Sequence, residues 1–204
     1  MRRTQAERTE STVNALVDAA RELYGSDGFE ATSLESVAAQ AGVSKGAVYH
    51  HFDGKRQLFR AVFEREVHRM AAPVAQAYTR KDDPWDAFEA GCRAFLTECL
   101  KPDVQRIVLL DAYGAIGWEE MRRLEAPLLE MMEAGISRAA QAGRIDSRPP
   151  EPLAHFLFGA LCETAMIVAR AGGEKEAHRR AVTEIGQILG GLAKDAVSPP
   201  RRRR

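Results

Sequence analysis

The sequence predicts an all-α protein, in which an N-terminal three-helix domain with a helix-turn-helix precedes a larger C-terminal helical domain. Apolar residues recur along the chain at the i, i+3, i+4, i+7 spacing of amphipathic helices, and no β-type alternation appears. Prolines and glycines separate these periodic segments. The 204 residues, 45% hydrophobic and 28% charged, are enough to bury a core.

The first helix is predicted from about Glu10 to Ser26, and residues 25–29 turn the chain into the next element. Its apolar residues form one stripe, composed of Val13, Leu16, Val17, Ala20, Leu23 and Tyr24. We expect this helix to brace the two short helices that follow it.

Residues 32–55 have the pattern of two short helices joined by a tight turn. A helix start is predicted at Thr32, because Thr32 and Glu35 have the spacing of a capping box. The apolar residues after it share one face, namely Leu34, Val37, Ala38 and Ala41. Gly42 supplies the left-handed backbone that ends a helix, and Ser44 is placed to cap the next one.

The second short helix, at about 44–51, has one polar side and one buried side. A projection at about 100° per residue puts four residues on the polar side: Lys45, Gly46, Tyr49 and His50. Val48 lies nearly opposite and should pack on the preceding helix. A glycine among hydrogen-bond donors lets a helix approach base edges and phosphates closely. Lys55 follows at a helix start, where free backbone N–H groups favour an anion.

The run AGVSKGAVYHHF, followed by Lys55 and Leu58, resembles the DNA-binding domain of the TetR family of bacterial transcriptional regulators. The resemblance covers about residues 10–60, and beyond them only helical character and length agree. It implies an all-helical homodimer that binds double-stranded DNA. The candidate DNA-binding residues are Thr32, Ser33, Ser44, Lys45, Gly46, Tyr49, His50 and Lys55. An ordinary helix pair within a bundle is the alternative.

The total charge does not indicate nucleic acid, because 29 basic and 29 acidic residues cancel. The local balance does: residues 40–60 hold four basic residues and one acidic residue, 4 − 1 = +3. An N-terminal arm with Arg2, Arg3 and Arg8 could extend this charge, although such termini are more often disordered. The block from Pro199 to Arg204 is expected to be a disordered basic tail.

Further helices are expected at about 55–78, 84–100, 102–113, 118–142, 151–171 and 174–197, and Pro73 is placed to bend the first of them. We therefore divide the chain into a DNA-binding domain at 1–54, an effector-binding and dimerisation domain at 55–198, and the tail at 199–204. The last two helices are expected to form the dimer interface through Leu153, Leu157, Leu161, Ile185, Leu189 and Leu192. The alternative is that these stripes are intramolecular core.

The middle helices are expected to enclose the small-molecule effector pocket that the resemblance implies. Aromatic and soft apolar residues suit a largely apolar ligand. The candidates are Phe95, Leu96, Cys99, Tyr113, Ile116, Trp118, Met121, Met132, Phe156, Cys162 and Met166. For any one of them, core packing is the alternative role, and Tyr113 and Trp118 are favoured because each has a polar group near a glycine break.

Enzymatic function is not expected. The chain has no phosphate-binding loop, nucleophile elbow or dinucleotide fingerprint, and no histidine has a glutamate three residues before it. Three cysteines without a C-x-x-C pair favour neither zinc nor disulfides, so no metal or cofactor is predicted. No run of 18 apolar residues and no secretory leader is seen, which indicates a cytoplasmic protein.

The sequence thus predicts a homodimeric repressor that binds a palindromic operator and leaves it when an effector binds. One alternative is an activator, or a regulator whose ligand promotes binding, with the same fold. Another, from a different class, is a helical ligand-binding or scaffold protein with a vestigial helix-turn-helix. The operator, the regulated genes and the effector cannot be derived from the sequence.

Overall fold

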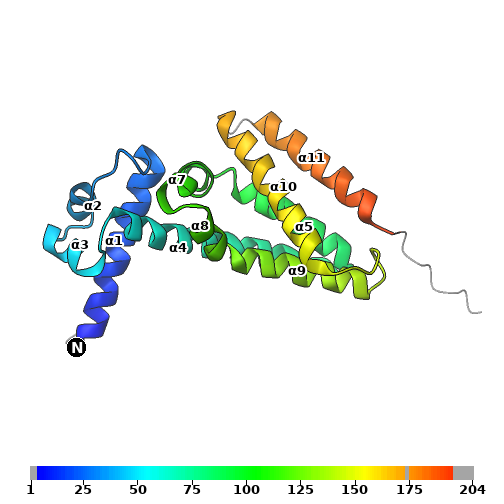
Figure 1. Ribbon diagram of the computed structural model, residues 1–204, viewed down its shortest axis with the longest axis horizontal. Helices are drawn as coiled ribbons and strands as arrows, with labels where there is room; N and C mark the ends of the chain where they lie inside the picture. Colours follow the sequence, from blue (N-terminus) through cyan, green and yellow to red (C-terminus); the bar gives the residue numbers. More distant parts are fainter. Residues whose placement is uncertain (1–3, 173–174, 195–204) are drawn as a thin grey trace, which may run out of the picture.

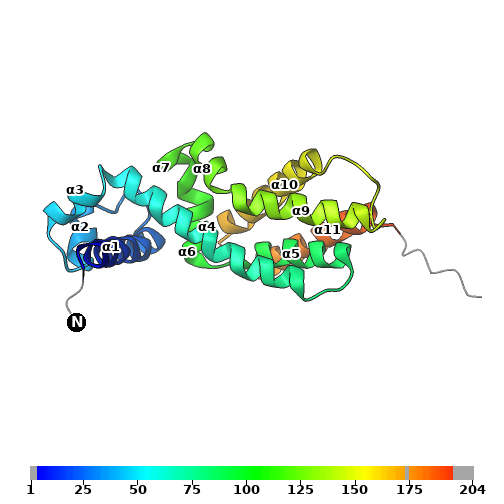
Figure 2. The same ribbon diagram turned by 90° about the horizontal axis from the view of Figure 1, so that it is seen from below.

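The computed structural model describes residues 4–172 and 175–194, and these residues contain helices and no strands. The molecule is elongated, with a small three-helix unit at one end and a helical bundle at the other (Figure 1). The long helix α4, Lys55–Thr79, begins in the small unit and runs into the bundle, as the turned view also shows (Figure 2). The predicted all-α class and two-part organisation are confirmed.

The small unit consists of α1 (Gln5–Asp27), α2 (Leu34–Gln40) and α3 (Lys45–His51). The first helix begins five residues before its predicted start. Its true cap is Thr4, whose Oγ1 accepts a hydrogen bond from the Glu7 N–H, while the Glu7 carboxylate accepts one from the Thr4 N–H. The apolar stripe begins only at Val13, so hydrophobic periodicity alone predicts a start of α1 that is too late.

The core of the small unit is shared with α4. The rings of Tyr24, Phe29 and Phe59 meet edge to face or tilted, with centroid distances of 5.0 to 6.0 Å. Leu58, Phe59, Val62 and Phe63 of α4 are all fully buried. This burial fixes the first turns of α4 to the helix-turn-helix, so movement of α4 moves the small unit.

The bundle contains α5 (Pro84–Glu98), α6 (Pro102–Val104), the π-helix η1 (Gln105–Asp111), α7 (Ala112–Ile116), α8 (Trp118–Leu124), α9 (Ala126–Gln141), α10 (Pro150–Arg170) and α11 (Lys175–Leu192). Helices α4, α5, α9 and α10 pack on one another, and α11 lies along α10 and α5. Figure 1 shows α11 beside α10, on the side of the bundle away from α4.

Two predicted helices are interrupted. The segment 102–113 is divided by the seven residues of η1. The segment 118–142 breaks at Glu125, two residues before Pro127, which lacks an N–H and disfavours helical backbone in the residue before it. These breaks position the side chains of α8 beside α10.

Helix α10 is strongly apolar, although Glu151, His155 and Glu163 interrupt it and leave no run of 18 apolar residues. By length and composition alone it is apolar enough to cross a membrane, with a mean hydropathy of 1.5 over its 18-residue window. Only 39% of that window is buried within the protein, although the helix packs on α5, α9, α11 and η1. An apolar helix with an uncovered face in a bundle is typical of an interface between subunits.

Several expectations fall on residues outside the described ranges. They concern Arg2 and Arg3 of the N-terminal arm, the end of the last predicted helix after 194, and the tail at 199–204.

Candidate DNA interface and ligand cavities

The start of α2 differs from its predicted capping box. The N-cap is Ser33, whose Oγ accepts from the Ser36 N–H at 3.0 Å, and the Ser36 hydroxyl oxygen accepts from the Ser33 N–H at 3.1 Å. Thr32 instead donates its hydroxyl to the Gly28 carbonyl oxygen at 2.8 Å and is 3% exposed. The Thr32 hydroxyl is therefore buried and already has a partner, whereas the Ser33 side chain is exposed to solvent.

The turn between α2 and α3 has the predicted geometry. Gly42 has φ of 66°, in the left-handed region, and the Val43 N–H donates to the Ala38 carbonyl oxygen at 3.0 Å. The Ser44 Oγ accepts from the Ala47 N–H at 3.2 Å and caps α3. The predicted roles of Gly42 and Ser44 in fixing this turn are confirmed.

Helix α3 has the two faces that the projection predicts. Val48 is fully buried, whereas Lys45, Gly46, Tyr49 and His50 are exposed. Tyr49 is 50% exposed and is one of the few large hydrophobic side chains at the surface of the described chain. No described residue comes close to the position of a Gly46 side chain except the Ser44 Oγ, at 3.9 Å. Helix α3 therefore presents an exposed polar face, and at Gly46 in this face no side chain protrudes.

The two lysines of this region are engaged in contacts that the sequence analysis missed. Lys45 pairs with Glu35 of α2, and this ion pair raises the pKa of the ammonium group and lowers the pKa of the carboxyl group. Lys55 donates to the Glu30 carbonyl oxygen at 3.0 Å and lies 4.4 Å from the centroid of the Phe29 ring. Lys45 can exchange its exposed partner for a phosphate, but Lys55 is held against the α1–α2 loop.

The local positive charge is also smaller than the count from sequence. Arg60, one of the four basic residues between 40 and 60, pairs with Glu120 of α8 and so contacts the bundle. Arg56 remains exposed beside α3. The polar face of α3 therefore depends on hydrogen-bond donors and a close approach more than on net charge.

Polar contacts join the small unit to the bundle. The Arg21 Nε of α1 donates to Glu66 of α4 at 2.6 Å, and the same guanidinium pairs with Asp103 of α6. The Phe29 N–H donates to Asp111 of η1 at 2.7 Å. Helices α4 and α6 and the π-helix η1 thus hold Arg21 of α1 and the backbone at Phe29, which lie next to the helix-turn-helix.

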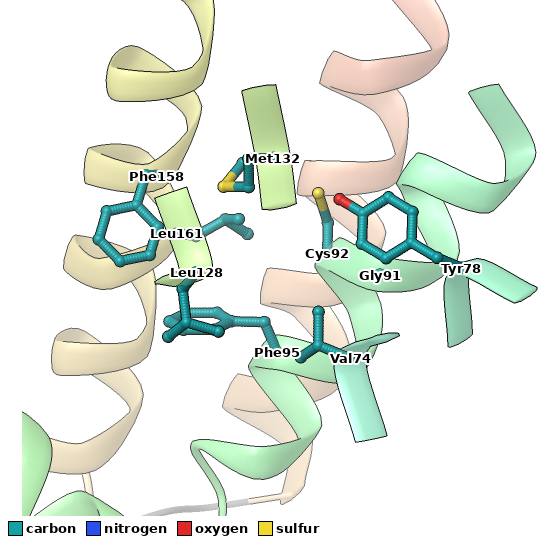
Figure 3. A pocket seen from close by; sticks show the side chains of 9 residues that line it. All are labelled: Val74, Tyr78, Gly91, Cys92, Phe95, Leu128, Met132, Phe158 and Leu161. Carbon is teal, nitrogen blue, oxygen red and sulfur yellow. The ribbon is translucent and has the colours of Figure 1, made fainter. Parts of the chain in front are cut away.

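An apolar cleft lies inside the bundle (Figure 3). Its lining residues come from α4, α5, α9 and α10 and are Val74, Tyr78, Gly91, Cys92, Phe95, Leu128, Met132, Phe158 and Leu161. Phe95 and Met132 belong to the predicted effector set. The open volume is only about 10 Å³, because the side chains nearly fill the cleft.

Tyr78 is the polar member of this cleft that the sequence analysis missed. Its ring packs where a Cβ on Gly91 or Gly135 would stand, and it meets the Phe88 ring at a centroid distance of 6.3 Å. Burial raises the pKa of its hydroxyl far above the usual value. The signal was present, because an isolated glycine within a helical pattern often marks the close approach of another group.

A second, larger cavity opens between α8, α9 and α10. Its volume is about 290 Å³, and it is lined by Trp118, Arg122, Glu125, Leu129, His155, Phe158 and Gly159. Of these residues, only Trp118 was predicted for a ligand site. Phe158 lines this cavity and the inner cleft, so one ring separates the two spaces.

The other predicted pocket residues line neither of these two spaces. Leu96 and Cys99 are core, and Met121, Cys162 and Met166 are half-buried at its edge. Ile116 lines an open hollow at the start of α8, and Phe156, which is 69% exposed, lines an apolar hollow between α5, α10 and α11. Tyr113 is 64% exposed and lines none of these spaces. Burial raises the pKa of the Cys92 and Cys162 thiols to about 12, so they stay protonated at neutral pH.

The predicted dimer residues need correction. Leu157, Leu161, Ile185 and Leu189 are all at most 6% exposed, because α10 and α11 bury them within their own chain. Leu153 and Leu192 are half-buried. The uncovered apolar side chains of these helices belong to neighbouring positions, namely Phe156, Ile167 and Ile188. Leu157, Leu161, Ile185 and Leu189 therefore belong to the intramolecular core, the alternative that the sequence left open, and a dimer interface on these two helices stays a prediction.

No group of three or more histidine, cysteine, aspartate or glutamate side chains that could hold a metal ion is found in the described ranges.

Comparison with protein families matches residues 16–62 to the bacterial regulatory proteins of the tetR family, and residues 85–192 to the C-terminal domain described as tetracyclin repressor-like. The first match contains α2 and α3 with their turn, and the second contains the whole lining of the larger cavity and the lining of the inner cleft apart from its α4 residues.

Individual proteins agree with these matches. The chain is 33% identical over 172 residues to the transcriptional repressor AcnR of Corynebacterium diphtheriae, covering 79% of this chain and 82% of the repressor. It is 27% identical over 156 residues to the Tn10 TetC protein of Escherichia coli, covering 76% and 79% of the two chains. The crystal structure of a TetR-family regulator from Pectobacterium atrosepticum superposes with a TM-score of 0.82 at 31% identity, covering 97% of this chain and all of that one.

Proposed function

The chain belongs to the TetR family of bacterial transcriptional regulators, and from this premise we propose that it is a homodimeric repressor that binds a palindromic operator and leaves it when a small molecule occupies the C-terminal domain. The observation that carries the DNA-binding part is the exposed face of α3. Buried Val48 holds the helix in place, while Gly46 and the donors beside it stay open. We assign base and phosphate contacts to Ser33, Lys45, Gly46, Tyr49 and His50.

Dimerisation is supported by the uncovered side of α10 and α11. Phe156, Ile167 and Ile188 are each more than half exposed, which is costly for large apolar side chains unless another surface covers them. A symmetric operator requires two recognition helices about 34–36 Å apart. Pairing α10 and α11 with their copies in a second chain would bury these side chains and supply the second α3.

The regulatory step is supported by how α4 joins the two parts of the chain. Tyr78 near the end of α4 lines the inner cleft, and Lys55 at its start follows directly on the helix-turn-helix. The cleft is nearly closed, so a ligand has to displace a side chain such as Tyr78 to enter it. A ligand that prefers the opened cleft would shift α4 and thereby the spacing of the two α3 helices, which lowers operator affinity through differential binding of two states.

The test begins with selection of the operator from random double-stranded DNA. We expect enrichment of an inverted repeat, which a gel-shift assay then uses as a probe. Tyr49→Ala should weaken binding of the repeat by about tenfold, because one good base or phosphate contact is worth about 1–3 kcal/mol. Tyr113→Ala is the matched control, since Tyr113 is also an exposed tyrosine, at 64% against 50% for Tyr49, and lies in α7 outside the helix-turn-helix.

Unchanged affinity in Tyr49→Ala, or an equal loss in both variants, would exclude the assignment of α3 as the reading helix. Repression is tested with a reporter gene placed behind the selected operator. Expression should be low with the protein present and should rise when α3 carries Tyr49→Ala. The opposite response would identify an activator of the same fold. DNA binding also implies that the protein acts in the cytoplasm, without a membrane partner.

A further inference from the structure

The cavity between α8, α9 and α10 has a charged wall, unlike the apolar inner cleft. At about 290 Å³ it lies at the lower end of the size range of small-molecule sites, about 300–1,000 Å³. Gly159 forms part of its α10 wall, and no atom lies within 4 Å of where a Cβ would stand. The space is therefore open at that wall rather than filled by neighbouring side chains.

Arg122 is held in place by aromatic rings. Its guanidinium carbon lies 5.3 Å from the centroid of the Phe158 ring and 5.9 Å from that of the Trp118 ring. Both rings line the cavity, so the guanidinium and two apolar faces border the same space. Stacking of this kind limits the freedom of a long side chain before any ligand arrives, which reduces the entropy cost of binding.

The guanidinium has donors to spare. One N–H donates to the Glu125 carboxylate at 3.0 Å. A guanidinium carries more N–H donors than this contact uses, in a fork that matches a carboxylate. Arg122 is one-third exposed, so the remaining donors are accessible from the cavity.

We propose that this cavity binds a small aromatic carboxylate, with its carboxylate on the free donors of Arg122 and its flat ring against Trp118 and Phe158. The site is distinct from the inner cleft, and ligand binding to it can be measured without DNA. Leu129 completes the apolar wall for the ring. A charge-assisted contact of this kind is about twice as strong as a neutral hydrogen bond.

The charges around the cavity favour an anion over a cation. Glu125 is the acidic group of the lining, and it is already paired with Arg122. Its pKa is raised to about 7 by burial, which weakens its negative charge at neutral pH. His155, the other titratable group of the lining, has its Nδ1 on the Glu151 carbonyl oxygen and adds no negative charge. A ligand cation would instead meet Arg122 with repulsion.

The position of the cavity connects it to the DNA-binding unit. Trp118 and Arg122 lie on α8, and Glu120 of the same helix pairs with Arg60 in the first turns of α4. Phe158 separates the cavity from the inner cleft. A ligand in this cavity would therefore contact α8, which is paired with α4, and Phe158, which borders the inner cleft, and both take part in the proposed regulatory movement.

The experiment uses isothermal titration calorimetry of the full-length protein with benzoate, benzamide and benzamidine, three flat molecules that differ in charge. We expect one benzoate per chain, and about tenfold or more weaker binding of the neutral amide and of the cationic amidine. Arg122→Gln should abolish the preference for benzoate. Arg80→Gln, a change at an exposed arginine outside the cavity, should retain it.

A second variant tests the place of binding without touching a charge. Gly159→Leu should fill the open wall and prevent benzoate binding while the melting temperature is maintained, because nothing stands in the way of the new Cβ and leucine favours a helix over glycine. Equal binding of the three probes, preference for benzamidine, or benzoate binding that survives in folded Arg122→Gln or Gly159→Leu would overturn the proposal. Calorimetry contains no DNA, so failure to find an operator would instead count against the proposed function.

Discussion

Glu125 should make the protein less stable as the pH rises from acid to neutral. It sits at the break between α8 and α9 and is 6% exposed. Burial raises its pKa from 4.5 to about 7, and the Arg122 guanidinium offsets only part of that effect. The Cys162 and Cys99 thiols and the ring of His155 also lie near this carboxyl group, and neither thiol carries a charge at neutral pH.

The sign follows from proton binding. Since the folded state holds this proton more tightly than the unfolded chain, the contribution of Glu125 to the free energy of unfolding is highest below about pH 4.5. It falls as the pH rises and levels off above about pH 7. One pKa unit corresponds to about 1.4 kcal/mol, so the contribution of Glu125 amounts to about 3 kcal/mol between these limits.

Glu125→Gln removes this titration while conserving the shape of the side chain. We expect the variant to gain about 3 kcal/mol in unfolding free energy relative to the wild type when the pH is raised from about 4.5 to about 8. Urea unfolding followed by circular dichroism measures it, at one protein concentration because association adds to stability. Glu130→Gln, at an exposed position of α9, controls for the change in net charge. A difference between Gln and wild type that is constant with pH would refute the reasoning.

Three further predictions concern the dimer, the turn and the inner cleft. Ile188→Glu places a charge on the uncovered side of α11 and should shift the protein to monomer in analytical ultracentrifugation, whereas Gln187→Glu at the exposed neighbouring position should not. Gly42→Ala should lower the unfolding free energy by about 1–2 kcal/mol, because alanine is strained at a φ of 66°. The new methyl group itself meets no atom, so the whole effect comes from the backbone, and an unchanged melting curve would contradict this. Gly91→Ala would force the tyrosine ring of α4 out of its place and should cost about 1–3 kcal/mol, whereas Gly114→Ala, with open space around it, should cost nothing.

The helix-turn-helix was predictable because its determinants are local. Gly42, Ser44 and Val48 act within a few residues of their own position, through a backbone angle, a cap and one buried face. The capping box at Thr32 was the exception. Two adjacent hydroxyl residues offered two possible caps, and the contact of Thr32 with the Gly28 carbonyl oxygen decided between them.

The ligand cavities were much less predictable. Of the predicted effector residues, Phe95, Met132 and Trp118 line the two spaces described and Ile116 and Phe156 line other hollows, but Tyr113 has the same chemistry as a pocket residue and lies at the surface. Arg122 was not considered, because a charged residue beside other charged residues on a helix is usually exposed to solvent. Its place between two rings depends on Phe158 of α10, which lies 158 − 122 = 36 residues further along the chain.

The sequence by itself determined the helical class, the two-part organisation, the family and the exposed face of α3. These depend on periodicity and short-range caps, which act between residues a few positions apart. Only the tertiary structure decided which side of α10 and α11 stays uncovered, how Tyr78 fills the inner cleft, and that Arg122 and Glu125 border a cavity. Such features arise when helices distant in sequence pack together, because the same apolar stripe can face its own core, a partner or a ligand.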